Sequence, residues 1–314
     1  MEPFLPFTPI RWTLYSKGEL FGAFDGSDAS SFGKTQDFAI YRHYVSEGRS
    51  NATSPFSSMM QALHDSSING ALRSLLAGRR VAGVMGGHRM PRDAKPYAEV
   101  ARLSRRLTRA GMLVCSGGGP GAMEATHLGA ALANSGERVL EKALERLASA
   151  PTLPDLSGMV RPDGSTDAAL LEQAHAWFRP AWEVAIDLAD PGESLSVPTW
   201  QYGHEPSSPL AFHIAKYFQN SIREDGLLAI ATQGVVYTSG RAGTIQEIFQ
   251  DAAQNYYQTY LHASPMVLLG VDLWTKTFPV AQVLRSLFGE TFASLVLVTD
   301  DVAEAAAFLE RFKP

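Results

Sequence analysis

Residues 112–125, MLVCSGGGPGAMEA, decide the fold. Four apolar residues end abruptly at three glycines, and a run of good helix formers follows. The stretch therefore predicts a buried strand, a tight turn and a helix. A glycine turn that enters a helix directs free backbone N–H groups at whatever lies above it, and that position favours phosphate. A glycine triplet alone is equally compatible with a tight turn that binds nothing.

A second strand and turn come before this stretch. Residues 81–85 (VAGVM) are apolar and are followed by Gly86 and Gly87, and residues 97–110 have an amphipathic helical pattern that ends at Gly111. Strand, helix and strand within about thirty residues predict a parallel sheet with a right-handed crossover. Ligands bind beyond the carboxyl ends of such strands. We therefore expect both glycine turns on one edge of the sheet.

Residues 234–247, GVVYTSGRAGTIQE, repeat this architecture further along the chain. A strand ends, glycines turn, and a helix is predicted to begin at Thr244. Glu247 lies in its first turn, where the helix dipole favours a carboxylate, so this acid could be no more than a helix-end charge. The apolar face predicted for this helix consists of Ile245, Ile248, Phe249, Ala252, Ala253 and Tyr256.

The rest of the chain divides into an N-terminal extension, 1–78, and a domain, 79–314, that carries a helical insertion at 137–192. The extension is most helix-like at 57–76 and is expected to pack on the domain or on a second subunit. The insertion is interpreted as a lid, an oligomer surface or a simple decoration, and its second helix (166–188) as interrupted near Pro180. Further elements are predicted as strands at 194–197, 266–269 and 295–298 and helices at 209–223, 280–287 and 301–312, the last capped by Asp301.

The composition is that of an ordinary soluble protein. The 314 residues are 45% hydrophobic and 19% charged, which is enough for one large or two modest domains. The net charge of −5 and the lack of a basic run do not indicate a nucleic-acid surface. Cys115 is the one cysteine, so an internal disulfide is excluded. We see neither a signal peptide nor an apolar run near the ~20 residues of a membrane span, and expect a cytoplasmic protein.

The two glycine stretches together resemble the motifs of the Lonely guy family, whose members were long labelled possible lysine decarboxylases. GGGPGAMEA at 117–125 is similar to the family's GGGxxGxM, and SGRAGTIQE at 239–247 to its PGGxGTxxE. The segments PMVLLG, DLWTKTFPVAQVL and VTDDVAEA near the end of the chain are similar too. The resemblance covers roughly 81–314 without the insertion and is strongest to the longer bacterial members.

This resemblance implies a Rossmann-like, doubly wound α/β fold with a mostly parallel sheet and helices on both faces. It also implies a phosphoribohydrolase, which cleaves the N-glycosidic bond of a nucleoside 5′-monophosphate to free base and ribose 5-phosphate. The substrates would be cytokinin-type or ordinary purine and pyrimidine nucleotides. Family members are homodimers with sites at or near the subunit boundary, and they need no metal or organic cofactor.

The motifs carry the family's site onto this sequence residue by residue. Glu247 and an arginine on the preceding helix are implied as catalytic; Lys216 and Arg223 compete for that arginine, and Arg223 lies closer to the expected distance. Ser239 and Arg241 replace a proline and a glycine of the family motif, and Arg241 could either bind phosphate through a bidentate contact or block the site. The positions that match the two motifs are Gly118, Gly119, Gly121 and Met123 in the first and Gly240, Gly243, Thr244 and Glu247 in the second.

The chemistry implied at these positions is glycosidic cleavage through an oxocarbenium-like transition state, which carboxylates stabilise. Glu247 would hold the ribose hydroxyls or orient water, and phosphate would lie on the N–H groups of Gly243 and Thr244, neutralised by Arg223 or Arg241. The base would lie near the turn at 86–87, against Met123. Glu124 would contact ribose or base, or serve only as a helix-end acid.

Other readings remain open. His88, His204 and Glu205 follow predicted strands but receive no role, and the histidines and the cysteine have no metal-ligand spacing, so no metal site is expected. The departures at 239 and 241 favour an alternative, a nucleotide- or cofactor-binding sensor or carrier without hydrolysis. A decarboxylase with pyridoxal phosphate ranks last, because few lysines lie near either loop. The expected partners are a nucleoside monophosphate and a second copy of the chain, with no nucleic acid and no membrane.

Overall fold

The computed structural model describes residues 5–52, 54–259 and 262–313. Their strands form one sheet of seven parallel strands in the order β4-β3-β2-β1-β5-β6-β7. The order reverses at β1, as in a doubly wound fold, so the predicted fold class is confirmed. The strands are β1 Val81–Met85, β2 Leu113–Ser116, β3 Ser194–Ser196, β4 His213–Ile214, β5 Gly234–Tyr237, β6 Met266–Leu269 and β7 Val296–Thr299.

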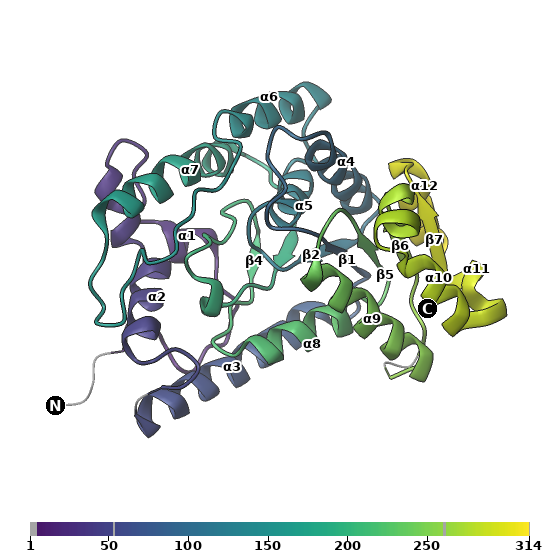
Figure 1. Cartoon of the computed structure of the whole chain (residues 1–314). Helices are drawn as coiled ribbons and strands as arrows, with labels where there is room; N and C mark the ends of the chain where they lie inside the picture. The colour runs from purple at the N-terminus through teal and green to yellow at the C-terminus, as the bar shows by residue number, and fades with distance from the viewer. Residues whose placement is uncertain (1–4, 53, 260–261, 314) are drawn as a thin grey trace.

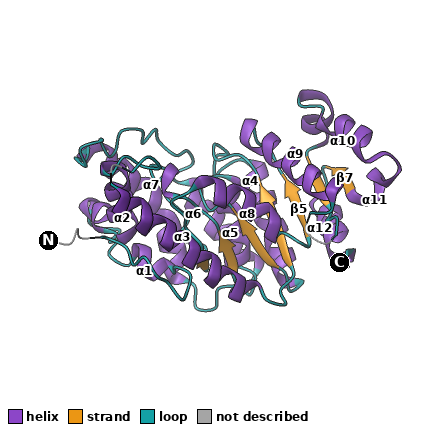
Figure 2. Cartoon of the chain, turned by 90° about the horizontal axis from the view of Figure 1, so that it is seen from below, coloured by secondary structure: helices purple, strands orange, loops and turns teal. Residues whose placement is uncertain are grey.

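Helices cover both faces of this sheet (Figures 1 and 2). Side chains alternate across each strand: Val81 and Met85 of β1 belong to the hydrophobic core on one face, and Ala82 to the core on the other. The first face is covered by α8 Asn220–Ile230, α9 Ala242–Tyr257 and α10 Val280–Phe288. The second face is covered by α4 Lys95–Arg109, α5 Ala122–Ala131 and α12 Val302–Arg311, the last capped by Asp301 as predicted.

The N-terminal segment packs on the domain at the β4 end of the sheet (Figure 1). It contains α1 Lys17–Phe21, the 3₁₀ helix η1 Ala29–Lys34, α2 Gln36–Ser46 and α3 Pro55–Leu76. The helix predicted at 57–76 is therefore present. Tyr15 forms an antiparallel bridge with Ile214 of β4, and the backbone of each residue donates to the other at 3.0 Å. This bridge covers part of an edge strand that would otherwise expose unpaired backbone groups.

The segment 137–192 forms two helices, α6 Glu137–Ala148 and α7 Ala168–Asp187, which pack on each other. The predicted break at Pro180 is wrong, because α7 continues through it. Proline removes one backbone donor from a helix, but here its neighbours Trp177, Phe178 and Ala181 are buried, and this packing offsets the lost bond.

The long helix predicted at 209–223 is wrong. Residues 213–214 form β4 and α8 begins only at Asn220. The extended conformation is imposed by partners distant in sequence, since β4 lies between β3 and the bridge to Tyr15. The short elements that complete the chain are η2 Trp200–Tyr202, η3 Leu273–Thr277, η4 Gly289–Thr291 and α11 Phe292–Leu295.

The apolar face predicted for α9 is only partly right. Ile248 and Ala252 are buried, but Phe249, Ala253 and Tyr256 are exposed. The buried side instead uses polar residues with partners in the described chain, such as Asp251, which accepts from the Tyr237 hydroxyl at 2.7 Å. As for membranes, each helix in the described ranges is too short or too polar to cross one.

Candidate functional site

The glycine turns that follow β2, β1 and β5 lie side by side, because these strands are neighbours and run parallel. Gly87 N–H donates to the Ser239 carbonyl at 2.8 Å, and Ala122 N–H donates to the Gly87 carbonyl at 3.2 Å. The turn after β1 therefore connects the first glycine loop, residues 117–121, with the second, residues 239–243. Gly86 is tightly packed between the two loops as well, because a Cβ added there would lie 2.7 Å from the Cβ of Ala122.

The first glycine loop is filled by the protein itself. Gly118 and Gly121 have φ angles of +78° and +67°, which side chains rarely adopt. A Cβ at Gly118 would collide with the Ser196 hydroxyl, and one at Gly121 with the Gly87 carbonyl. Ser208 N–H donates to the Gly118 carbonyl at 2.9 Å. Most backbone of this loop is therefore committed to packing.

The second glycine loop is open. Ser239, Arg241 and Gly243 are exposed, and a Cβ at Gly243 would meet no atom of the described chain within 4 Å. Thr244 is buried, with its side chain against Gly240. Arg241 is the N-cap of α9 and its side chain does not cap the helix. Because the first N–H groups of a helix have no partner within it, this loop offers donors to a ligand.

Arg223 lies between the two loops. It comes from the first turn of α8, and its Nε donates to the Val197 carbonyl, just beyond β3, at 3.0 Å. Its guanidinium occupies the space where Gly117 would carry a side chain, next to the Met123 sulfur. Only glycine at 117 allows this approach. The predicted residues Met123 and Arg223 thus meet at the end of β2.

Glu247 is half-buried in the second turn of α9, not in the first turn as predicted, and no ion pair within 4.0 Å joins it to Arg223 among the described residues. Burial raises the pKa of Glu247 to about 7; the positive charge of Arg223 opposes this rise and the neighbouring Glu224 adds to it. A carboxyl group with a pKa near neutrality exists in both protonation states at physiological pH. It can therefore take up or release a proton during a reaction.

Glu124 does not face this site. It is 1% exposed, and its two oxygens accept from Arg92 at 2.7 Å each, with a third bond from the Tyr97 hydroxyl at 2.9 Å. The guanidinium of Arg92 also lies 3.8 Å from the centre of the Trp177 ring. Of the two roles considered for Glu124, contact with ribose or base is excluded by these partners, and the acid instead ties α5 to α4 and, through Arg92, to Trp177 of α7.

Lys216 is also committed elsewhere. It lies after β4 and not on a helix, it is 1% exposed, and its Nζ donates to Asp37 at 2.7 Å and to Ser207 at 2.9 Å. Burial lowers the pKa of this amine, and Asp37 opposes the shift. Lys216 therefore cannot take the place of the family's arginine or bind a phosphate at the loops, and of the two candidates Arg223 is the one that reaches them.

A cavity of about 520 Å³ adjoins the first glycine loop at Pro120 and Gly121. Residues 151–157 and Trp177 of the segment 137–192 also line it. His88 and Glu205, which the sequence left without a role, also line it; His88 Nε2 lies 3.9 Å from a Glu205 oxygen. The other Glu205 oxygen is 3.8 Å from the Cβ position of Gly119. His88 follows β1 by three residues, and this strand-end position is the signal that could have identified it.

Two buried hydroxyls at this edge have no hydrogen-bond partner among the residues the structure describes. They are Ser116 Oγ at the end of β2 and Ser196 Oγ at the end of β3, each on a residue with 0% exposure. A buried polar group without a partner is unfavourable and is usually satisfied by water or ligand. Over the same described ranges, no three histidine, cysteine or acidic side chains converge as metal ligands would.

Compared with known protein families and curated proteins, the sequence matches no family model and no curated protein. The geometry of the sheet edge formed by residues 86–87, 117–121 and 239–247 is therefore the basis for a functional proposal.

Proposed function

We propose that this protein is a nucleoside 5′-monophosphate phosphoribohydrolase of the kind that the glycine motifs imply. The observation that carries the proposal is Glu247, a half-buried carboxyl group that follows the second glycine loop on α9 and has a pKa raised to about 7, with Arg223 near enough for its charge to oppose that rise. Acids tuned in this way cluster at catalytic sites, although structural charge networks also perturb pKa values. The glycine edge supplies the second half of the support, since it offers backbone donors next to this acid.

The reaction needs one bond broken and one formed. The C1′–N bond breaks as the base leaves with its electron pair and takes up a proton, and a water oxygen bonds to C1′ while losing a proton. Glu247 would accept the proton of that water and stabilise the positive charge that develops on the ribose ring. Arg223 would favour the charged form of Glu247 and add positive charge for the phosphate side of the substrate.

The phosphate is proposed to lie at the start of α9. The exposed N–H groups around Gly243 and the hydroxyl of Thr244 would donate to it, and the helix dipole favours an anion there. Arg241 is exposed at the same helix start and would add a charged contact without filling the loop.

The base is proposed to lie toward the 520 Å³ cavity, past Met123 and Gly119. A nucleobase has two apolar faces and a polar edge. The prolines at 120, 151 and 154 offer flat apolar surface, and Glu205 with His88 offers hydrogen-bonding groups at one side. The volume falls in the range of ligand pockets, about 300–1,000 Å³.

A second copy of the chain is the proposed protein partner. Large apolar side chains are exposed together on α9 and α10, among them Phe249, Tyr256, Tyr257 and Val283, with exposed fractions between 37% and 77%. Exposed apolar groups of this size are typical of interaction surfaces. Sedimentation of the parent and of a Phe249→Ser, Tyr256→Ser variant tests this, and an unchanged monomer in both would contradict it.

The function is tested by incubating the purified protein with a panel of nucleoside monophosphates and measuring free base. We expect base release by the parent, loss of release with Glu247→Gln, and retained nucleotide binding in that variant. Thr244→Val should weaken binding of the monophosphate more than that of the nucleoside. Binding without any base release by the parent would favour the second candidate, a sensor or carrier, which the exposed Arg241 in place of the family's glycine supports.

A further inference from the structure

Apart from the bond from Arg223 Nε to the Val197 carbonyl, the helix turn that carries Arg223 is weakly anchored by its own side chains. Arg223 is the fourth residue of α8, and the buried residues of this helix are Leu227 and Leu228, one turn later. Residues 220–226 are half-buried or exposed. The N-cap, Gln219, is exposed and makes no side-chain bond to the helix. A helix start of this kind frays easily unless another group satisfies it.

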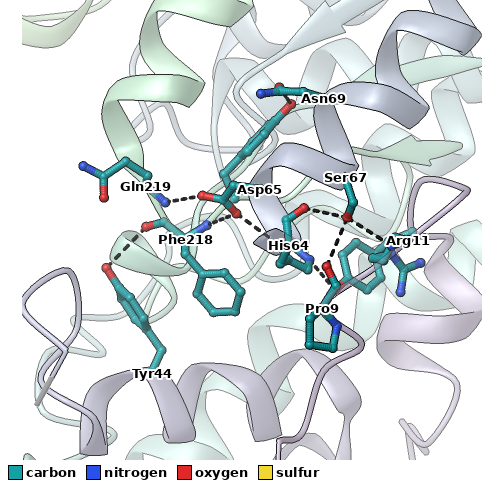
Figure 3. Close-up of polar contacts among 11 residues, drawn as sticks. Pro9, Arg11, Tyr44, His64, Asp65, Ser67, Asn69, Phe218 and Gln219 are labelled. Carbon is teal, nitrogen blue, oxygen red and sulfur yellow. Dashed lines mark hydrogen bonds and ion pairs between the residues drawn. The ribbon is translucent and has the colours of Figure 1, made fainter. Parts of the chain in front are cut away.

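Asp65 supplies the missing anchor from the middle of α3. One carboxylate oxygen accepts from Phe218 N–H at 3.0 Å and the other from Gln219 N–H at 2.8 Å (Figure 3). Both bonds hold backbone, so they set the point at which the chain enters α8. A negative charge at the start of a helix is also favoured by the helix dipole.

Asp65 is itself held in place by a chain of buried hydrogen bonds. His64 Nδ1 lies 3.0 Å from an Asp65 oxygen, and His64 Nε2 lies 2.8 Å from the Tyr15 hydroxyl. Burial lowers the pKa of His64, so the ring is neutral at pH 7, and burial raises the pKa of Tyr15, which keeps its proton. Nδ1 therefore donates to Asp65, and Tyr15 donates to Nε2.

The residues just before α8 form hydrogen bonds and packing contacts with the same N-terminal segment. The Tyr217 hydroxyl donates to Asn69 of α3 at 2.8 Å, and the Tyr44 hydroxyl of α2 donates to the Phe218 carbonyl at 3.4 Å (Figure 3). The Phe218 ring lies 5.0 Å from the His64 ring, edge to face. The segment 217–219 thus has fixed contacts to α2 and α3 immediately before a loosely packed helix start.

We propose that Asp65 is a positioning residue for Arg223: it fixes the start of α8 and so makes the N-terminal segment part of the candidate site. The positioning of Arg223 by Asp65 holds whichever reaction the protein catalyses. The effect of that positioning on catalysis rests on the proposed function. The sequence offers no local reason for α8 to start where it does, so the anchor has to come from another part of the chain.

The experiment uses the full-length protein and measures the pKa of the Glu247 carboxyl by ¹³C NMR. The charged side chains that act on Glu247 are Arg223, which lowers its pKa, and Glu224, which raises it; both belong to α8. Asp65→Asn should let the helix start move and raise the Glu247 pKa toward the value found in an Arg223→Met reference. Where base release is measurable, kcat should fall by about 100-fold, the loss expected for a displacement near 1 Å, with a smaller change in KM.

Two further variants separate positioning from general destabilisation. Asp37→Asn removes another acid of the N-terminal segment that pairs with buried Lys216 but does not contact α8. It should lower the melting temperature and leave the Glu247 pKa unchanged. Adding Gln219→Ser to Asp65→Asn supplies a local N-cap, and this should return the Glu247 pKa and kcat toward the parent.

The outcomes are distinguishable. A lower melting temperature for Asp65→Asn with an unchanged Glu247 pKa would reduce Asp65 to a structural residue and overturn the proposal. An equal pKa shift in Asp37→Asn would do the same. A shifted pKa in a protein that releases no base from any nucleotide would leave the positioning role in place and refute the proposed hydrolase.

Discussion

The two glycine loops have similar sequences and opposite environments. In the first, residues 117–121, the space beside nearly every glycine is occupied by Ser196, Arg223, Met123 or the backbone of Gly87. In the second, residues 239–243, the backbone is largely exposed and the space beside Gly243 is empty. Glycine is needed in the first loop for close packing. In the second loop Gly240 makes room for the Thr244 side chain, whereas Gly243 leaves the helix start accessible.

The acids that follow the loops differ in the same way. Glu124, after the first loop, is enclosed with Arg92 and Tyr97, whereas Glu247, after the second, is half-buried, has a raised pKa and forms no ion pair in the described chain. A repeated motif therefore does not mean a repeated role. The first loop shapes the site, and the second is where a phosphate would be bound.

The largest expected effect is a difference in the free energy of unfolding between variants of Glu124 and of Glu247. Glu124→Gln leaves Arg92 buried without its countercharge and should lower the free energy of unfolding by about 3–5 kcal/mol. Glu247→Gln removes a carboxylate whose charged form is disfavoured, so at pH 8 it should leave stability unchanged or raise it. Urea unfolding of the two variants checks the difference. Equal losses would mean that Glu247 is as firmly paired as Glu124.

The next comparison is between glycines. Gly121→Ala forces a side chain into a positive φ and against the Gly87 carbonyl, and strain with overpacking should cost about 2–4 kcal/mol. Gly243→Ala adds a methyl group in open space on a helix, so stability should stay within about 1 kcal/mol of the parent. Both free energies come from denaturant titration at one pH. A strong loss at Gly243 would contradict the open second loop.

The pH dependence of stability gives a smaller effect. The pKa of Glu247 rises from 4.5 to about 7 on folding, so the folded protein binds an extra proton between these values. Its contribution to stability is complete below pH 4.5 and is lost as the pH rises to 7. Burial also raises the pKa of Asp251 to about 7, so the two acids share this window.

The variant Glu247→Gln isolates the contribution of Glu247 to the pH dependence of stability. Between pH 4.5 and 8 the melting temperature of the variant should fall less with rising pH than that of the parent, because the variant lacks the Glu247 contribution and keeps those of Asp251 and the buried histidines. Parallel curves for the two proteins would place the Glu247 pKa at its ordinary value and remove the main support for the proposed catalytic role.

The smallest effect concerns Arg241. Because this side chain is exposed, its contact with a phosphate is screened, and Arg241→Ala should weaken binding of a nucleoside monophosphate by about tenfold or less. The loss should shrink as salt is raised. Arg146→Ala, an exposed arginine on α6, is the matched control and should bind as the parent does. Tighter binding by Arg241→Ala would show that this residue blocks the loop.

The sequence predicted the elements whose signals are local. The strand at 81–85 is a short apolar run that ends at Gly86, the strand at 234–237 is an apolar run three residues before Gly240, and α12 follows a capping Asp301, so pattern and structure agree. The common edge of the glycine turns also follows from local signals, because consecutive parallel strands must end on the same side.

The errors come from partners that are distant in sequence. Residues 209–223 have a helical composition, but Tyr15 and Asp65 hold this stretch in an extended entry to α8. Lys216 is next to a helix in sequence and near Asp37 in space. Likewise, Arg92 could not be paired with Glu124 from spacing alone, because 32 residues separate them.

The contacts of α2 and α3 with residues 217–219, just before α8, affect the order in which the protein folds. Contacts such as that between Tyr44 and Phe218 close a gap of 174 residues. During translation the aromatic N-terminal segment therefore leaves the ribosome long before residues 217–219, on which it docks, have been synthesised. Its apolar side chains stay exposed to solvent during this time. Arg223 can reach its final position only after the N-terminal segment has docked on residues 217–219. A chain in which this docking fails is therefore largely folded but lacks a complete site.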